Sequence, residues 1–164
     1  MGDDVEGAFN DLVGELDYAM LVVTVSAGGE RGGCLVGFAT QTSISPPRFA
    51  ICLSDKNRTY RLARGAGYIG VHFLAADDED LAELFGAETG DEIDKFARVA
   101  WTPGPDGAPL LDRCLNRFVG RIVDDRPVGD HHWFLLAPVL AEHAERLRPF
   151  PFHRAKRLEP GHEA

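Results

Sequence analysis

The chain has 164 residues, of which 45% are hydrophobic and 26% are charged, and its formal net charge is −9. This composition is typical of a globular protein and predicts a single domain over residues 1–164. The acidic balance disfavours nucleic acid as a partner, because phosphate backbones would be repelled. No apolar run reaches the roughly 18 residues of a membrane span and the N-terminus does not resemble a secretory signal, so we expect a cytoplasmic protein with no membrane contact.

The cysteines are odd in number, far apart and without a C-x-x-C pair: Cys34, Cys52 and Cys114. This pattern indicates neither a disulfide framework nor a cysteine zinc site. We expect three reduced thiols in the core.

The first third of the chain predicts one helix and three strands. Apolar residues repeat at the spacing of one helical face at Val5, Phe9, Leu12, Val13 and Leu16. They predict an amphipathic helix that packs as a lid on a sheet. Two β-rich runs at 20–27 and 34–43 flank the glycine-rich segment 28–33, which predicts a hairpin. A third strand at 48–54 is entered through paired prolines.

The rest of the chain alternates short helices with strands. Residues 56–67 predict a short helix that ends in a glycine cap, and GYIGVHFLA returns to a strand. DDEDLAELFG predicts a helix that ends near Gly86. Beyond the turn-rich WTPGPDGAP, two further β-type runs lie at 115–125 and 131–143. Six or seven strands joined by short turns predict an antiparallel closed or partly closed barrel, rather than a parallel doubly wound sheet.

Two polar clusters flank the strand RFAIC. The first, at the end of a strand, comprises Thr40, Gln41, Thr42, Ser43 and Ser45. It is either a turn held by local side-chain bonds or a loop that binds a ligand. The second comprises Lys56, Asn57, Arg58 and Thr59 at the start of a helix. This set suits a phosphate group, and Asn57 or Asp55 also suits a helix cap. We expect the two clusters on adjacent strand ends, where they can share one ligand.

Histidines occur in the stretch VGDHHWFLL. His131 and His132 are neighbours on a predicted strand, so they point to opposite faces and no shared metal site is expected. Asp130 is placed to orient the His131 ring by accepting its Nδ1 proton. His72 is interpreted as a strand residue with satisfied ring nitrogens. Dinucleotide, P-loop and nucleophile-elbow motifs are absent from the sequence.

The order of these motifs resembles the flavin reductase-like family. The resemblance runs from about Met20 to Leu140 and is carried by TQTSISPP, RFAICLS, KNRTY, GVHFLA, LFG, DKF, WTPGPDGAPLL and VGDHHWFLL. It implies a mainly β fold with a few short helices, a six-stranded or similar antiparallel Greek-key split barrel of the FMN-binding type. It also implies a homodimer, with the domain core at about 17–145. The basic segment 146–164 then forms a C-terminal tail, either solvated or contributing to the site of a small anion.

The same resemblance implies an NAD(P)H-dependent flavin reductase. Hydride would pass from NADH or NADPH to FMN or FAD, and the reduced flavin could serve a partner monooxygenase. Thr40, Gln41, Thr42 and Ser43 match the loop that holds the isoalloxazine edge and ribityl chain, although the sequence ATQTS departs from the common serine-rich pattern. Lys56, Asn57, Arg58 and Thr59 match the phosphate site, and Lys95 and Phe96 match a pair that approaches the flavin.

His131 matches the histidine of the family's G-D-H motif, which lies beside the flavin and is implicated in nicotinamide binding. His132 has no corresponding role. Two alternatives remain open at this point, namely a non-enzymatic FMN-binding electron carrier and a split-barrel protein that uses a deazaflavin.

Overall fold

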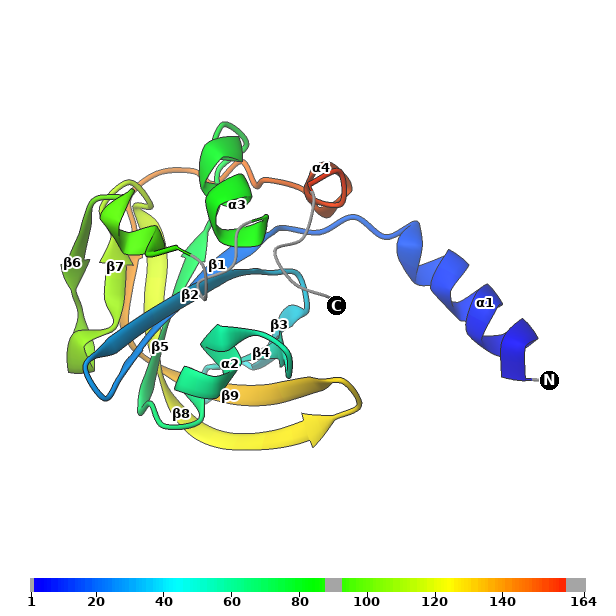
Figure 1. The fold of residues 1–164 in the computed structure, drawn as a ribbon, viewed down its shortest axis with the longest axis horizontal. Coiled ribbons are helices and arrows are strands. Elements are labelled where there is room, and N and C mark those ends of the chain that lie inside the picture. The colour runs from blue at the N-terminus through cyan, green and yellow to red at the C-terminus, as the bar shows by residue number, and fades with distance from the viewer. Residues whose placement is uncertain (1, 88–92, 159–164) are drawn as a thin grey trace.

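A computed structural model describes residues 2–87 and 93–158 of the chain. Its main element is a seven-stranded sheet in the order β2-β1-β5-β8-β9-β4-β3, and all of its paired neighbours are antiparallel. The strands are β1 (Leu21–Ala27), β2 (Glu30–Val36), β3 (Ala39–Ser43), β4 (Arg48–Ser54), β5 (Tyr68–Phe73), β8 (Asn116–Val128) and β9 (His131–His143). A small hairpin of β6 (Trp101–Pro103) and β7 (Pro109–Leu111) lies to one side (Figure 1). The prediction of a mainly β, antiparallel fold with few short helices is confirmed.

The helices lie outside the sheet. They are α1 (Gly2–Gly14), α2 (Arg58–Ala63), α3 (Glu79–Gly86) and α4 (Phe152–Ala155), with 3-10 turns η1 (Lys95–Ala97) and η2 (Pro105–Gly107). The prediction of α3 is confirmed, including its end at Gly86. No helix among the described residues is long and apolar enough to cross a membrane.

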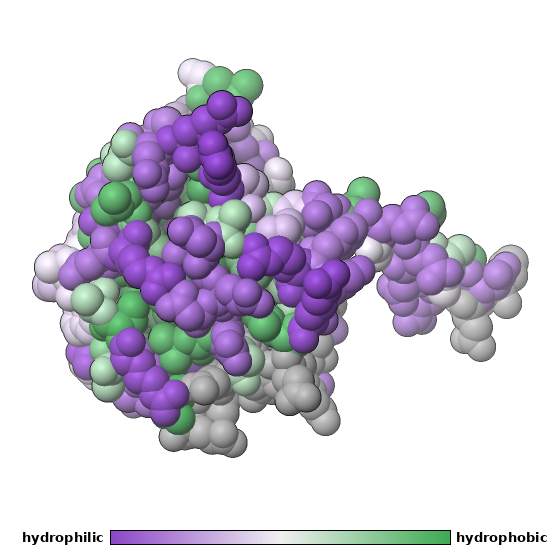
Figure 2. Space-filling model, turned by 90° about the horizontal axis from the view of Figure 1, so that it is seen from above, coloured by the Kyte–Doolittle hydropathy of each residue, from purple (hydrophilic) through white to green (hydrophobic). Residues whose placement is uncertain are grey.

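The N-terminal helix departs from its predicted position. Helix α1 projects away from the body of the protein, and Figure 2 shows it standing clear with hydrophobic residues on its surface. Val5, Phe9 and Leu12 remain more than half exposed. The expectation that this helix packs as a lid on the sheet is therefore wrong for a single chain, because an amphipathic pattern predicts a helix but does not specify its partner.

The β1–β2 hairpin turns at Gly28 and Gly29, whose φ angles are 59° and 80°. Consecutive positive φ angles are those of a type I′ turn, which glycine adopts without steric cost. The turn is therefore shorter than the predicted loop 28–33, since Glu30 already belongs to β2.

The run 34–43, predicted as one strand, forms β2 and β3 with a break at Gly37 and Phe38. At this break the Cys52 amide donates to the Phe38 carbonyl over 2.8 Å. This hydrogen bond joins the chain to β4 at the point where it passes from β2, at one edge of the sheet, to β3, at the other edge. The sheet consequently curls toward closure at this point. The predicted glycine cap of α2 is also wrong, because the residue that caps the helix is Arg64, in a right-handed conformation.

Both faces of β1 are buried, so the sheet separates two apolar clusters. Leu21, Val23 and Val25 face the inner cluster, together with residues of β4, β5 and β9. Val22 faces an outer cluster formed with α3, η1 and the C-terminal segment. A strand buried on both faces has a continuous apolar sequence rather than an alternating one, and LVVTVSA fits this rule.

The C-terminal segment belongs to the packed body. Phe150 is fully buried in the outer cluster, and Pro149 and Pro151 form β-bridges to Ala75 and Ala19. We expected a basic tail from residue 146, but residues 146–158 are held by these contacts. Residues 159–164 of that tail lie outside the described part of the chain.

Candidate functional site

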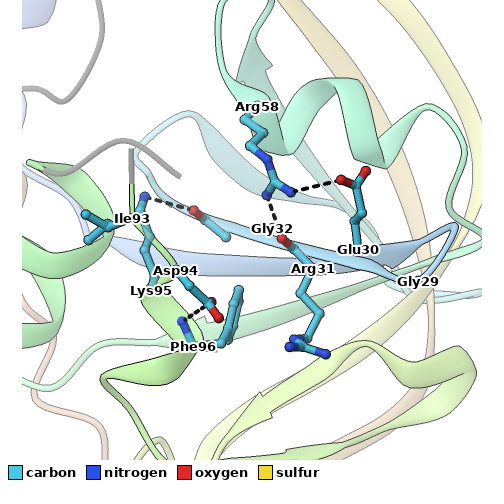
Figure 3. Close-up of a pocket in the computed structure, with 10 residues that line it drawn as sticks. Gly29, Glu30, Arg31, Gly32, Arg58, Ile93, Asp94, Lys95 and Phe96 are labelled. Carbon is cyan, nitrogen blue, oxygen red and sulfur yellow. Dashed lines mark hydrogen bonds and ion pairs between the residues drawn. The ribbon is translucent and has the colours of Figure 1, made fainter. Parts of the chain in front are cut away.

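Two cavities lie side by side along β2. The first, here called the polar cavity, has a volume of about 380 Å³ and is lined by Gly29 of the hairpin turn, by residues 30–33 of β2, by Arg58 and by residues 93–96 (Figure 3). The second, here called the histidine cavity, has a volume of about 170 Å³ and contains His131, Asn57, residues 34–38 and residues 52–54. Because consecutive residues of β2 and of the α2 start line both, the cavities adjoin and can hold one extended ligand.

His131 reaches the histidine cavity from the start of β9. The β8–β9 turn places Gly129 at a φ of 73°, and Asp130 follows at its tip. The His131 Nδ1 lies 2.7 Å from an Asp130 carboxylate oxygen. This hydrogen bond to His131 lowers the pKa of Asp130, so the carboxylate stays ionised and accepts the Nδ1 proton. The predicted contact between the two side chains is thus present.

Aromatic rings flank His131 in this cavity. The exposed ring of Phe38 lies 5.0 Å from the imidazole, centroid to centroid. Phe152 of α4 contributes a second aromatic wall and stacks on Tyr18 at 4.7 Å. The histidine cavity therefore offers flat apolar surfaces beside one polar ring, which suits a planar ligand.

His132 points to the opposite face of β9. Its ring is only 5% exposed and lies 2.6 Å from an Asp125 carboxylate oxygen. Tyr60 of α2 and Phe134 pack against it at 5.3 and 4.9 Å. The expectation that the two histidines do not meet is confirmed, and His132 joins α2 to the β8–β9 hairpin.

The start of α2 lies where the two cavities meet. Asn57 caps the helix, because its Oδ1 accepts from the Thr59 amide at 2.8 Å. The capping interpretation of Asn57 is therefore confirmed. Arg58 turns back to β2, where it donates to the Arg31 carbonyl at 2.6 Å and lies 3.8 Å from a Glu30 carboxylate oxygen (Figure 3).

Cys34 lies beneath the start of α2, beside the Asn57 and Thr59 side chains. Burial raises the pKa of the Cys34 thiol to about 11, which keeps it protonated at neutral pH. A protonated, buried thiol is a poor nucleophile. The prediction of free thiols in the core is confirmed for Cys34 and Cys114, and Cys52 is a free, half-buried thiol that lines the histidine cavity.

Lys95 and Phe96 form the base of the polar cavity. Lys95 is only 5% exposed, and its ammonium donates to the Gly33 carbonyl at 3.1 Å and the Phe85 carbonyl at 3.2 Å. A side chain at Gly33 would place its Cβ 2.8 Å from the Phe85 ring and 3.1 Å from the Phe96 ring. Glycine at this position lets η1 and α3 pack directly on β2.

The first polar cluster lies away from both cavities within one chain. Thr40 pairs with Ala50 and Gln41 with Phe49 in the β3–β4 hairpin, whereas the second cluster follows Ser54. Ser54 lies four residue steps along β4 from Ala50, which corresponds to roughly 13 Å. The expectation that the clusters lie on adjacent strand ends is wrong, because the antiparallel turn places them toward opposite ends of β4.

The first cluster shows the local bonding of a turn. The Gln41 side-chain amide donates to the Ser43 carbonyl at 3.2 Å, and Thr40, Gln41 and Thr42 are exposed. The Ser45–Pro46 peptide that follows is cis. Gln41 lines a separate apolar groove with Phe49, Phe73 and Phe118.

His72 is a structural residue. Its Nε2 accepts from the Leu111 amide at 3.0 Å and its Nδ1 lies 3.0 Å from the Val22 carbonyl, so the proton sits on Nδ1. Burial lowers the pKa of His72 to about 4. The interpretation of His72 as a satisfied strand residue is confirmed. Among residues 2–87 and 93–158, no group of three or more His, Cys, Asp or Glu side chains is arranged to hold a metal ion.

Three residues of the site were not predicted from the sequence. Arg31 lines the polar cavity, and Phe38 and Phe152 line the histidine cavity. The sequence did contain a signal for a site near Arg31, namely the glycine pair that follows it. Gly32 and Gly33 allow other parts of the chain to pack closely on β2 next to Arg31. Phe152 carried no local signal, since it reaches the cavity only through the folding of the C-terminal segment.

Comparisons with known proteins agree with this geometry. A family model described as "Flavin reductase like domain" matches residues 13–158. The relative named FMN reductase (NADH) RutF, from Ancylobacter novellus, is 32% identical over 123 residues, which cover 75% of this chain and 67% of the relative. The reductase component of 4-nitrophenol 4-monooxygenase/4-nitrocatechol 2-monooxygenase from Rhodococcus opacus is 29% identical over 148 residues, covering 90% and 77%.

A solved structure extends the comparison to three dimensions. The NADH:FAD oxidoreductase SgcE6 of Streptomyces globisporus C-1027 matches with a TM-score of 0.81 and 26% identity, covering 90% of this chain and 87% of that one. The similarity therefore includes the fold as well as the sequence.

Proposed function

We infer the reaction of this chain from its family: it belongs to the flavin reductase-like family and transfers hydride from a nicotinamide cofactor to a flavin. Relatives named FMN reductase (NADH) and NADH:FAD oxidoreductase support NADH as the donor and FMN or FAD as the acceptor. The observation that carries the proposal is the placement of His131 in an aromatic-walled cavity beside a second cavity lined by Arg31, Arg58 and Lys95.

The chain's own residues fit such cofactors. The flavin and the nicotinamide supply the hydride chemistry when bound, and the protein supplies orientation and exclusion of water. We propose that His131 contacts the nicotinamide and the flavin, while Asp130 fixes the imidazole with its proton on Nδ1. The walls formed by Phe38 and Phe152 keep water from the reacting faces.

We assign the flavin phosphate to the segment Lys56–Thr59. The hydrogen bond from the Arg58 guanidinium to the Arg31 carbonyl of β2 positions that side chain beside the segment. Lys95 and Phe96 act as the base of the same site. Thr40, Gln41, Thr42 and Ser43 are proposed to contact the isoalloxazine edge or ribityl chain. Their distance from His131 within one chain makes a second copy the route by which they would reach a flavin.

We propose a homodimer and a partner monooxygenase. The exposed apolar stripe of α1 and the apolar groove at Phe73 and Phe118 support contact between two copies, because exposed patches of this kind mark interaction sites. The Rhodococcus opacus relative is a monooxygenase reductase component, which supports delivery of reduced flavin to an oxygenase. Unpaired cysteines fit a reducing compartment, and we place the protein in the cytoplasm.

The test mixes purified protein with NADH or NADPH and with FMN or FAD, and follows nicotinamide oxidation. We expect turnover that falls roughly tenfold or more in His131→Ala, because positioning of the reactants is lost. Arg121→Ala is the control, since Arg121 is exposed on β8 and lines neither the two cavities nor the groove at Phe73 and Phe118. The absence of oxidation with every donor and acceptor pair would refute the proposal, and a tightly bound but unreactive flavin would instead indicate an electron carrier.

A further inference from the structure

The side chain of Arg31 is unusual among the cations of the polar cavity. Its guanidinium stacks over the Trp101 ring at 4.7 Å from the centroid. With the residues that the structure describes, this guanidinium forms no hydrogen bond or ion pair. Stacking fixes the plane of the group and leaves its N–H edge available, which is the geometry in which arginine binds phosphate.

The two carboxylates that line the described part of the polar cavity have other partners. Asp94 accepts from the Phe96 amide at 3.0 Å, and Glu30 lies within ion-pair distance of Arg58. Lys95 adds a third positive charge at the base of the cavity. Among the described residues, three cations and two carboxylates line this cavity, which is a local excess of positive charge in a protein with a net charge of −9. Such a concentration favours an anionic ligand.

Two of these cations suit two successive phosphates. In Figure 3, Arg58 approaches β2 from above, and the Arg31 side chain extends below the same strand. The Arg58 guanidinium donates a hydrogen bond to the Arg31 carbonyl, so the two side chains line neighbouring parts of the polar cavity. Arg31 lines the polar cavity but not the histidine cavity. If Arg58 binds the phosphate next to the ribityl chain, Arg31 is therefore placed to contact the next group of the ligand beyond that phosphate.

We propose that the polar cavity binds the adenosine monophosphate half of FAD, with Arg31 contacting the second phosphate of the pyrophosphate. The histidine cavity of about 170 Å³ is too small for a whole dinucleotide, whereas the polar cavity of about 380 Å³ reaches the size range of small-molecule sites, roughly 300–1,000 Å³. The inference rests on the proposed function and adds a preference for FAD over FMN. Arg31 is a specificity residue, because FMN lacks the group that it contacts.

The test measures flavin binding without turnover, by quenching of flavin fluorescence on titration with protein. We expect Arg31→Ala to weaken FAD binding roughly tenfold, as for the loss of one charge-assisted contact worth about 1.4 kcal/mol, and to change FMN binding by less than twofold. Arg121→Ala is the control for charge, since Arg121 is exposed on β8 outside both cavities. ADP should compete with FAD for the unaltered protein and compete less well in Arg31→Ala.

Two results would overturn the inference. Equal weakening of FAD binding and FMN binding in Arg31→Ala would show that Arg31 contacts the phosphate that both flavins share, or that it stabilises the fold. An effect confined to the KM for NADPH would assign Arg31 to the 2′-phosphate of the nicotinamide cofactor. Both results are distinguishable from failure of the proposed function, which would appear as flavin binding without oxidation of any nicotinamide cofactor.

Discussion

Acidification should destabilise the fold through His72, a residue outside the candidate site. Its Nε2 accepts from the Leu111 amide, so a second proton on the ring would break that bond inside the core. Burial lowers the pKa of His72 from 6.5 to about 4 in the folded protein. The unfolded chain therefore takes up the proton first as pH falls. The contribution of His72 to stability is complete above pH 6.5 and is lost between 6.5 and about 4.

The size of the effect follows from the two pKa values. Linkage gives a loss in the free energy of unfolding of about 2 kcal/mol at pH 5 and about 3 kcal/mol at pH 4, relative to pH 7. The variant His72→Gln does not titrate in this range. The stability difference between the unaltered protein and His72→Gln should shrink by these amounts as pH falls.

The assay is equilibrium urea unfolding at pH 7, 5 and 4, followed by tryptophan fluorescence at one protein concentration so that association does not vary. His143→Gln is the control, because His143 is exposed and its loss should leave the pH profile of the unaltered protein unchanged. A stability difference between the unaltered protein and His72→Gln that stays constant from pH 7 to pH 4 would refute the reasoning.

Two further predictions concern the polar cavity and the N-terminal helix. Lys95→Met should weaken flavin binding and lower the free energy of unfolding, because the Gly33 and Phe85 carbonyls lose their donor, at a cost of about 1–3 kcal/mol for each. An unchanged urea midpoint together with an unchanged flavin affinity would contradict the role given to the Lys95 ammonium. Removal of residues 1–16 should convert a dimer to a monomer in light scattering after size exclusion, because the apolar stripe of α1 is lost; a truncated protein that stays dimeric would remove α1 from the interface.

Strands and short helices with strong local signals were predicted well. Strand β4 follows two prolines and contains RFAICLS, and α3 begins with acids and ends at a glycine, so their limits are encoded in neighbouring residues. The break between β2 and β3 was missed, because it depends on a hydrogen bond between Phe38 and Cys52 that joins distant parts of the chain. The position of α1 was wrong for the same reason, since a stripe of apolar residues does not identify what covers it.

The candidate site was predicted where one motif contains both partners. Asp130 and His131 are adjacent in sequence, and strand alternation alone separates His131 from His132. Arg31 was missed because its significance depends on Trp101, which is 70 residues further along the chain. The separation of Thr40 from Asn57 depends on the direction of the β3–β4 hairpin, which composition does not specify.

The wall contributed by Phe152 has a consequence for biosynthesis. Strand β2 is translated early, yet the opposite side of the histidine cavity belongs to α4, which is translated after every strand of the sheet. A nascent chain that has completed its sheet but not this segment therefore still exposes the apolar surface that Phe150 and Phe152 cover in the folded protein, and exposed surface of this kind favours aggregation. Removing residues 149–158 should for this reason yield insoluble protein before it yields an inactive enzyme.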